Sequence, residues 1–150
     1  AHFMRGAERY HGKPIFYNLG SLLMEFEAGE SIIPPEMYTA YQLDPHAKPS
    51  DLHHHRAIGE AGQFVGFNAH PKFSQNIVLE VTIENGQVQL KVLPLDLGLD
   101  RENPVQRGLP KLAIPAVAEQ IFERLNQLSA FYDTQFKYTD EDHAFELISE

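Results

Sequence analysis

The most regular alternation of apolar and polar positions runs from Asn76 to Leu95. Two alternating runs flank the dipeptide Asn85-Gly86, which suits both positive-φ positions of a type I′ turn. The apolar positions of the two runs are Ile77, Leu79, Val81, Ile83, Val88, Leu90 and Val92. The spacing therefore predicts a β-hairpin with one buried face.

A second pattern has the period of an α-helix and extends from Pro115 to about Ala130. Its apolar stripe consists of Val117, Ile121, Phe122, Leu125 and Leu128. Proline is well tolerated in the first turn of a helix, so Pro115 marks the start. The pattern predicts an amphipathic helix that packs on a sheet. Further on, Ala144–Ile148 predicts a short closing strand.

The N-terminal stretch combines an irregular opening with short apolar runs. A turn is expected over Tyr10–Pro14, which contains a glycine and a proline. The continuous apolar run Ile15–Tyr17 predicts a strand buried on both faces, and Gly20 marks its end or a close backbone approach. A strand continuation is expected over Leu22–Phe26, ending at Ala28-Gly29.

Prolines and glycines interrupt the middle of the chain. Short helices are expected over Glu36–Leu43 and over Asp51–Ile58, the second capped by Ser50. The segment 44–75 otherwise reads as a long connection, and such connections are often lids or binding loops.

Composition and net charge exclude several kinds of partner and site. The chain has 150 residues, 43% of them hydrophobic and 22% charged, which fits a single globular domain. The formal net charge of -9 argues against nucleic acid and anionic membrane surfaces as partners. No cysteine is present, which excludes disulfides and thiolate metal sites. No apolar run approaches the about 20 residues that a membrane-spanning helix needs.

Several N-terminal residues carry a family resemblance. The matching positions are His2, Arg5-Gly6, Tyr10, Gly12–Tyr17 and Leu19-Gly20. In this order they resemble the C-terminal part of the bacterial CapA family, the poly-gamma-glutamate capsule synthesis proteins. Ala1, Asn18 and Ser21 stand where that family usually has Pro, Ser and Asn. The later runs Pro94–Gly98 and Arg107–Pro110 are also similar to the family's text.

This resemblance implies an α/β fold, namely the C-terminal part of a metallophosphoesterase-like β-sandwich flanked by helices. This chain, a single or partial domain, would contribute the β-hairpin and the C-terminal amphipathic helix. The implied function is capsule polymer synthesis or export, with the whole protein a metal-dependent phosphoesterase. The alternative is a non-catalytic assembly or polymer-binding factor with the same fold.

The resemblance also implies cofactors, partners and a location. The cofactors would be divalent metal ions of the Mn, Zn or Fe type. Their other ligands would precede Ala1, so these residues alone are expected to bind no metal and to be inactive. The partners would be an anionic polymer or phosphoester substrate and a capsule synthase complex. The family suggests an extracytoplasmic or membrane-associated location, and a cytoplasmic one stays open.

Three residues are candidates for the site. In the resemblance, His2 belongs to a histidine motif that binds metal, although position 2 of any chain can also be a disordered end. Arg5 is suited to bind a phosphate or carboxylate bidentately, or it pairs with Glu8 on the surface. Asn18 could orient a metal ligand or substrate, or it could bond its own backbone at a strand end.

Other polar residues favour ordinary roles. His53-His54-His55 cannot converge on one ion as a helix or as a strand, so a solvated segment is expected. The isolated histidines read as surface residues, and they are His11, His46, His70 and His143. Asp96 and Arg107 are expected to be structural, through a turn and an ion pair.

Overall fold

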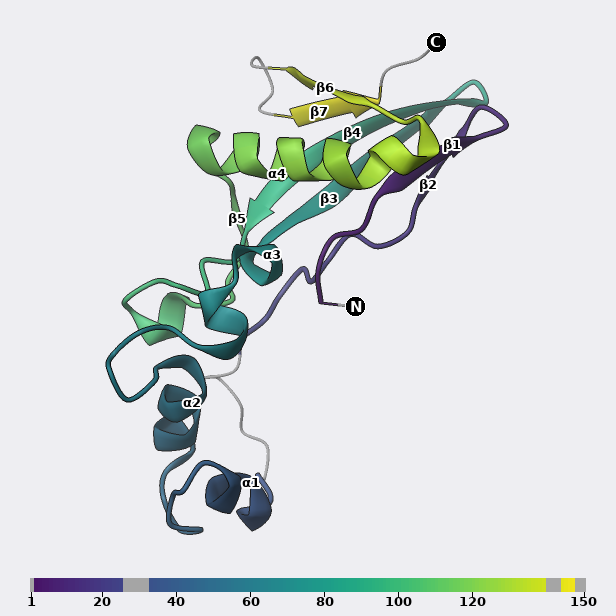
Figure 1. The fold of residues 1–150 in the computed structure, drawn as a ribbon. Helices are drawn as coiled ribbons and strands as arrows, with labels where there is room; N and C mark the ends of the chain where they lie inside the picture. Colours follow the sequence, from purple (N-terminus) through teal and green to yellow (C-terminus); the bar gives the residue numbers. More distant parts are fainter. Residues whose placement is uncertain (1, 26–32, 140–143, 148–150) are drawn as a thin grey trace.

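The computed structural model of this chain describes residues 2–25, 33–139 and 144–147. Over these ranges the protein is a mixed α/β fold with two antiparallel sheets and four α-helices. Helix α4 (Pro115–Ser129) lies along one face of the larger sheet, and a lobe of short helices extends from the base of that sheet (Figure 1). In the part of the chain that is described, no helix has both the length and the apolar character needed to cross a membrane.

The predicted hairpin is confirmed. Strands β3 (Gln75–Glu84) and β4 (Gln87–Asp96) pair antiparallel along their whole length. The turn residues Asn85 and Gly86 have φ values of 50° and 77°, as a type I′ turn requires.

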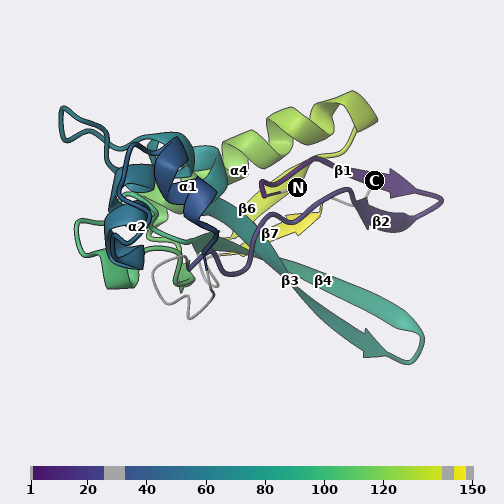
Figure 2. The same ribbon diagram turned by 90° about the horizontal axis from the view of Figure 1, so that it is seen from below.

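The single buried face is present only in the base of the hairpin. Ile77 is 4% exposed, whereas Ile83 near the tip is 69% exposed. Val81 and Val88 are exposed as well. The distal half projects past α4, as Figure 2 shows, so α4 does not cover it.

Three short strands complete the larger sheet. They are β5 (Lys111–Leu112), β6 (Phe136–Thr139) and β7 (Ala144–Leu147), in the order β3-β4-β7-β6 with β5 also on β4. Strand β7 confirms the predicted closing strand as far as Leu147, since Ile148 lies outside the described residues. Strand β6 was not predicted, and it is held by Asn126, whose side chain bonds the backbone N–H of Phe136 at 2.8 Å.

Helix α4 confirms the amphipathic prediction. Ala118, Ile121 and Leu125 are 0% exposed and pack with Ile77 and Val92 of the hairpin. The helix is also tied to the start of β3 by polar contacts. The Arg124 side chain donates to the Gln75 carbonyl at 2.9 Å, and burial lowers the pKa of Arg124.

The predicted turn at the N-terminus is also confirmed, but the doubly buried strand is wrong. Strands β1 (Ala7–Tyr10) and β2 (Lys13–Phe16) form a separate two-stranded ribbon that turns at residues 11–12. Ile15 is 40% exposed and Tyr17 is 49% exposed. A ribbon of two strands has only one layer beside it, so one face packs on α4 and the other meets solvent.

Beyond the ribbon the chain is irregular. Residues 21–25 contain no strand, and Leu22 and Leu23 are 62% and 56% exposed, so the strand expected over Leu22–Phe26 is wrong for these residues. Phe26 and Ala28-Gly29 lie outside the described residues. Gly20 does mark a close backbone approach, because a Cβ there would lie 2.9 Å from the Cβ of Asn76.

The lobe contains the short helices of the middle segment. They are α1 (Pro35–Ala40), α2 (Pro49–Ala57), η1 (Gly66–Ala69) and α3 (Pro71–Ser74). Helices α1 and α2 confirm the two predicted helices, although Lys48 rather than Ser50 is the cap of α2. Proline occupies the first turn of each of the three α-helices, where its missing N–H costs nothing. Two further short turns of 3-10 helix are η2 (Pro104–Gln106) and η3 (Ala130–Tyr132).

Candidate functional site

The irregular segment before β1 carries His2 and Arg5 and runs beside α3 (Figure 1). Its position is set by Asn18. The Asn18 side-chain amide donates to the Phe3 carbonyl at 2.7 Å, and the Asn18 carbonyl accepts from the Arg5 N–H at 2.9 Å. Asn18 therefore bonds the backbone of a segment far from its own. A role toward substrate stays a prediction.

His2 is exposed but has neighbours. Its Nδ1 lies 3.5 Å from the Ser21 hydroxyl oxygen. Its ring lies 5.5 Å, between centroids, from the ring of Phe67. This contact joins the first residues of the chain to η1, which is more than 60 residues away in the sequence.

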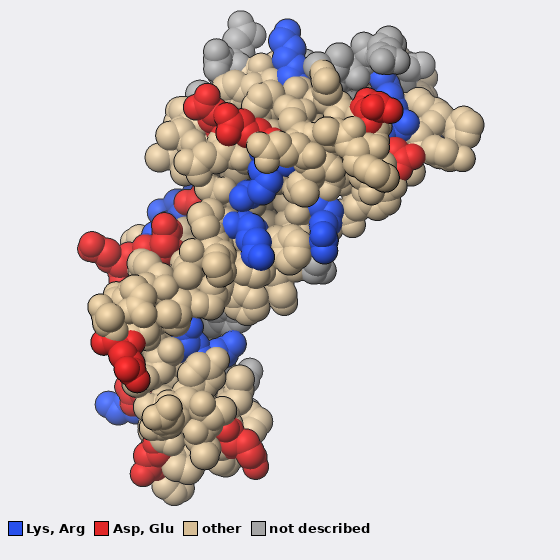
Figure 3. All heavy atoms as spheres, viewed as in Figure 1, with Lys and Arg blue, Asp and Glu red and all other residues tan. Residues whose placement is uncertain are grey.

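Arg5 and Lys72 lie over the same aromatic ring. The Arg5 guanidinium carbon is 4.7 Å from the centre of Phe3, and the Lys72 ammonium is 5.3 Å from it. Lysine and arginine side chains gather in the middle of this face of the molecule, where the N-terminal segment and α3 lie (Figure 3). Each cation is attracted by the electron-rich face of the ring.

Next to this segment the lobe encloses a pocket of about 420 Å³, which we call the basic pocket. Its basic lining residues are His53, Arg56, His70, Lys72 and Arg107. Its aromatic lining residues are Tyr41, Phe67 and Phe73. Among the described residues that line it, none is aspartate or glutamate. The basic pocket is thus locally cationic in a protein whose formal charge is -9.

Helix α2 explains why the histidine run does not form one site. His53 is half-buried and lines the basic pocket, together with Arg56 one turn later on the same face. His54 and His55 are exposed on other faces of the helix. The prediction that the three imidazoles diverge is confirmed, but His53 is not merely part of a solvated segment.

The basic pocket itself was missed from the sequence. Arg56 and Lys72 belong to no sequence motif, and His70 is exposed, as predicted, but it also lines this pocket. One local signal was available, since His53 and Arg56 share a helix face at i and i+3. The remaining lining residues come from the residue after α1, from η1, from α3 and the residue before it, and from the region after β4, and no local pattern unites them.

Arg107 has a structural role, as predicted. It is 5% exposed, its Nε donates to the Arg101 carbonyl at 2.7 Å, and its Nη2 donates to the Glu102 carbonyl at 3.1 Å. The guanidinium carbon also lies 5.2 Å from the centre of the Phe64 ring. Arg107 therefore braces the wall of the basic pocket.

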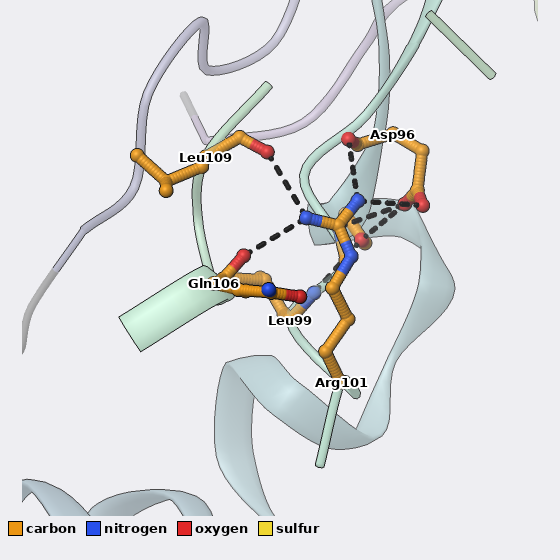
Figure 4. Close-up of polar contacts among 7 residues, drawn as sticks. Asp96, Leu99, Arg101, Gln106 and Leu109 are labelled. Atoms are coloured by element: carbon orange, nitrogen blue, oxygen red, sulfur yellow. Dashed lines mark hydrogen bonds and ion pairs between the residues drawn. The ribbon is translucent and has the colours of Figure 1, made fainter. Parts of the chain in front are cut away.

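Asp96 organises the turn after β4, and this too confirms a structural role. One carboxylate oxygen accepts from the Ser74 hydroxyl and from the Gly98 N–H, both at 2.8 Å. The other oxygen forms an ion pair with Arg101 at 3.3 Å. Figure 4 shows the Arg101 guanidinium between Asp96 and the carbonyls of Gln106 and Leu109.

A metal site requires donor side chains that converge on one point. Within residues 2–25, 33–139 and 144–147, no three histidine, aspartate or glutamate side chains come close enough together to hold an ion. His2 is a single imidazole, and a stable site needs three or four ligands. The described residues do not fit a metal centre by themselves, and no catalytic step through a metal is derived from them.

The chain is similar in sequence to longer proteins that are uncharacterized. No protein-family model matches it. Two similar proteins are the uncharacterized proteins y4sH and y4uA of Sinorhizobium fredii (strain NBRC 101917 / NGR234). Each is 30% identical to this chain over 144 residues, which covers 93% of this chain and 31% of the relative. The chain therefore spans about a third of the length of these curated relatives.

Proposed function

We propose that this chain is the C-terminal part of a CapA-type protein with a metallophosphoesterase-like sandwich. The whole protein would act on an anionic phosphoester, or bind an anionic polymer, in the synthesis or export of poly-gamma-glutamate capsule. The resemblance of the N-terminal residues suggests the family, and one structural observation supports an anionic ligand next to the candidate site. The ring of His2, the candidate metal ligand, lies against Phe67, which lines the basic pocket.

The arrangement of charge supports an anionic ligand. Arg5 and Lys72 share the Phe3 ring, and Lys72 also lines the basic pocket. Positive side chains therefore extend from the pocket onto the segment that carries His2. Guanidinium and ammonium groups bind phosphate and carboxylate oxygens through charge-assisted hydrogen bonds. Asn18, which anchors that segment, would hold Arg5 in place.

The proposed metal would use His2 as one ligand, with the remaining ligands in other parts of the whole protein. The role of the described residues would be to bind and orient the anion beside it.

The test is metal content of the whole protein, measured by elemental analysis after purification. We expect divalent metal to be bound and His2→Ala to reduce it, because a lost ligand opens the site. His11→Ala is the matched control, since His11 is an exposed histidine in the turn of the ribbon. A whole protein that takes up no metal would refute the phosphoesterase proposal.

A non-catalytic polymer-binding or assembly factor is the second candidate. It is favoured by the exposed positions of Arg5 and Lys72, because an anionic polymer that lies along the surface could contact both side chains. In that case the whole protein would bind oligomeric poly-gamma-glutamate without metal. The substitution Lys72→Ala would weaken this binding, and salt would weaken it further.

A further inference from the structure

We infer that the basic pocket binds a phosphorylated small molecule that carries a planar aromatic ring. This goes beyond the proposed function, because it concerns a ligand held by this chain without any metal. The two ideas share the pocket but can fail separately. The phosphoesterase proposal is tested by the metal content of the whole protein. The aromatic phosphate ligand is tested by its binding to this chain without metal.

The aromatic wall of the pocket is held in place by packing against buried residues. Phe67 and Phe73 are in edge-to-face contact, with 4.6 Å between ring centroids and 76° between their planes. Both rings pack against a buried apolar cluster formed by Met24, Leu97 and Leu99. Each ring remains half-buried rather than buried, so part of its surface is left to line the pocket. Such a wall favours a flat, ring-bearing ligand over an irregular polar one.

The cationic part of the pocket adjoins that wall. The Lys72 ammonium lies 5.0 Å from the centre of the Phe73 ring. Arg56 and His70 also line the cavity, Arg56 from α2 and His70 from the residue before α3. A ligand whose ring rests on the phenylalanines would therefore carry its anionic group within reach of lysine and arginine donors. This juxtaposition of ring and charge matches an aryl phosphate or a nucleotide.

The size and charge of the cavity disfavour other classes of ligand. A volume of about 420 Å³ lies in the range of small-molecule sites and is much larger than a bare phosphate ion needs. A metal cation would meet no carboxylate among the described lining residues. A neutral apolar molecule would make no use of the Lys72 ammonium, which lies beside the Phe73 ring at the pocket.

A neighbouring cavity has a different set of charged lining residues. It has a volume of about 490 Å³ and shares Asn68 and His70 with the basic pocket. Its lining also includes Asp96 and Asp100, so a phosphate there would face two carboxylates. We therefore assign the anionic ligand to the basic pocket and not to this second cavity.

The test is calorimetric titration of the protein in the presence of a metal chelator, with phenyl phosphate as the probe. Inorganic phosphate and phenol are the matched half-ligands. We expect phenyl phosphate to bind about tenfold or more tightly than either one, because it uses the ring and the charge together. Equal affinity for phenyl phosphate and inorganic phosphate would refute the aromatic part of the inference. No measurable binding of phenyl phosphate would refute all of it.

Three variants locate the site. Lys72→Ala should weaken phenyl phosphate binding about tenfold through loss of a charge-assisted contact. Lys137→Ala removes an exposed lysine on β6 and should leave the affinity unchanged. Phe67→Leu keeps an apolar side chain but loses the flat face, so it should weaken phenyl phosphate and not inorganic phosphate. Circular dichroism checks that each variant is folded. A folded Lys72→Ala protein with wild-type affinity would overturn the assignment.

Discussion

Gly6 lies where the N-terminal segment meets the last turn of α4, and Gly6→Ala should destabilise the fold strongly. A Cβ at this position would lie 2.7 Å from the carbonyl carbon of Leu128 and closer still to its oxygen. These are backbone atoms, so no side chain can rotate away to relieve the contact. The N-terminal segment and the end of α4 would have to move apart.

The cost has two parts. Overpacking against a fixed backbone costs about 1–3 kcal/mol. Separation would also lengthen the buried hydrogen bond from the Ala7 N–H to the Ser129 hydroxyl, now 2.9 Å, and such a bond contributes about 1 kcal/mol. We therefore expect Gly6→Ala to lower the free energy of unfolding by about 2–4 kcal/mol.

Urea unfolding followed by circular dichroism measures this change. Gly12→Asn is the control, because Gly12 has open space around it and a φ of 75° that asparagine tolerates. The control should change the free energy of unfolding by less than about 0.5 kcal/mol. If Gly6→Ala unfolds at the same urea concentration as wild type, Gly6 does not approach the backbone of α4 this closely in solution.

Two further predictions test the core and an ionisable surface group. Leu125→Ala should cost about 2–5 kcal/mol because Leu125 is 0% exposed in the core, while Glu123→Ala on the exposed face should cost under about 0.5 kcal/mol. Thermal midpoints check this pair, and equal shifts would contradict the packing of α4. The hydrogen bond from Tyr17 to Glu8 raises the pKa of Tyr17 from 10.0 to about 12. The folded state therefore holds this proton more tightly than the unfolded state, so the associated stability is present below pH 10 and is lost as pH rises toward 12. Urea midpoints should fall less steeply over this range in Tyr17→Phe than in wild type, and parallel curves would show that the hydrogen bond does not form in solution.

The elements that the sequence determined by itself are those with a local cause. The turn between β3 and β4 follows from Asn85-Gly86, because few other residue pairs adopt two consecutive positive φ values. Helix α4 follows from its apolar stripe. The apolar residues recur with the period of an α-helix, so in a helix they lie on one face and can be buried together. The divergence of His53, His54 and His55 is equally local, since helix geometry alone separates neighbouring side chains.

Only the tertiary structure decided how much of each apolar face is buried. Ile77 and Ile83 belong to the same alternating run, but Ile77 packs in the core with residues of α4, whereas Ile83 is exposed in the part of the hairpin that projects past α4. The run Ile15–Tyr17 is apolar throughout, yet its strand belongs to the β1–β2 ribbon, and Ile15 and Tyr17 stay exposed. Burial depends on which layers meet, and an apolar pattern does not carry that information.

The candidate site depends even more on the tertiary structure. The basic pocket draws on Tyr41, Arg56, Lys72 and Arg107, which come from separate parts of the chain, and His2 contacts Phe67, one of its lining residues. A chain with a net negative charge can enclose a cationic cavity because local potential depends on the few charges that folding gathers there. That gathering requires contacts between residues far apart in the sequence, and these form only when the lobe closes onto the base of the hairpin and the N-terminal segment lies across it.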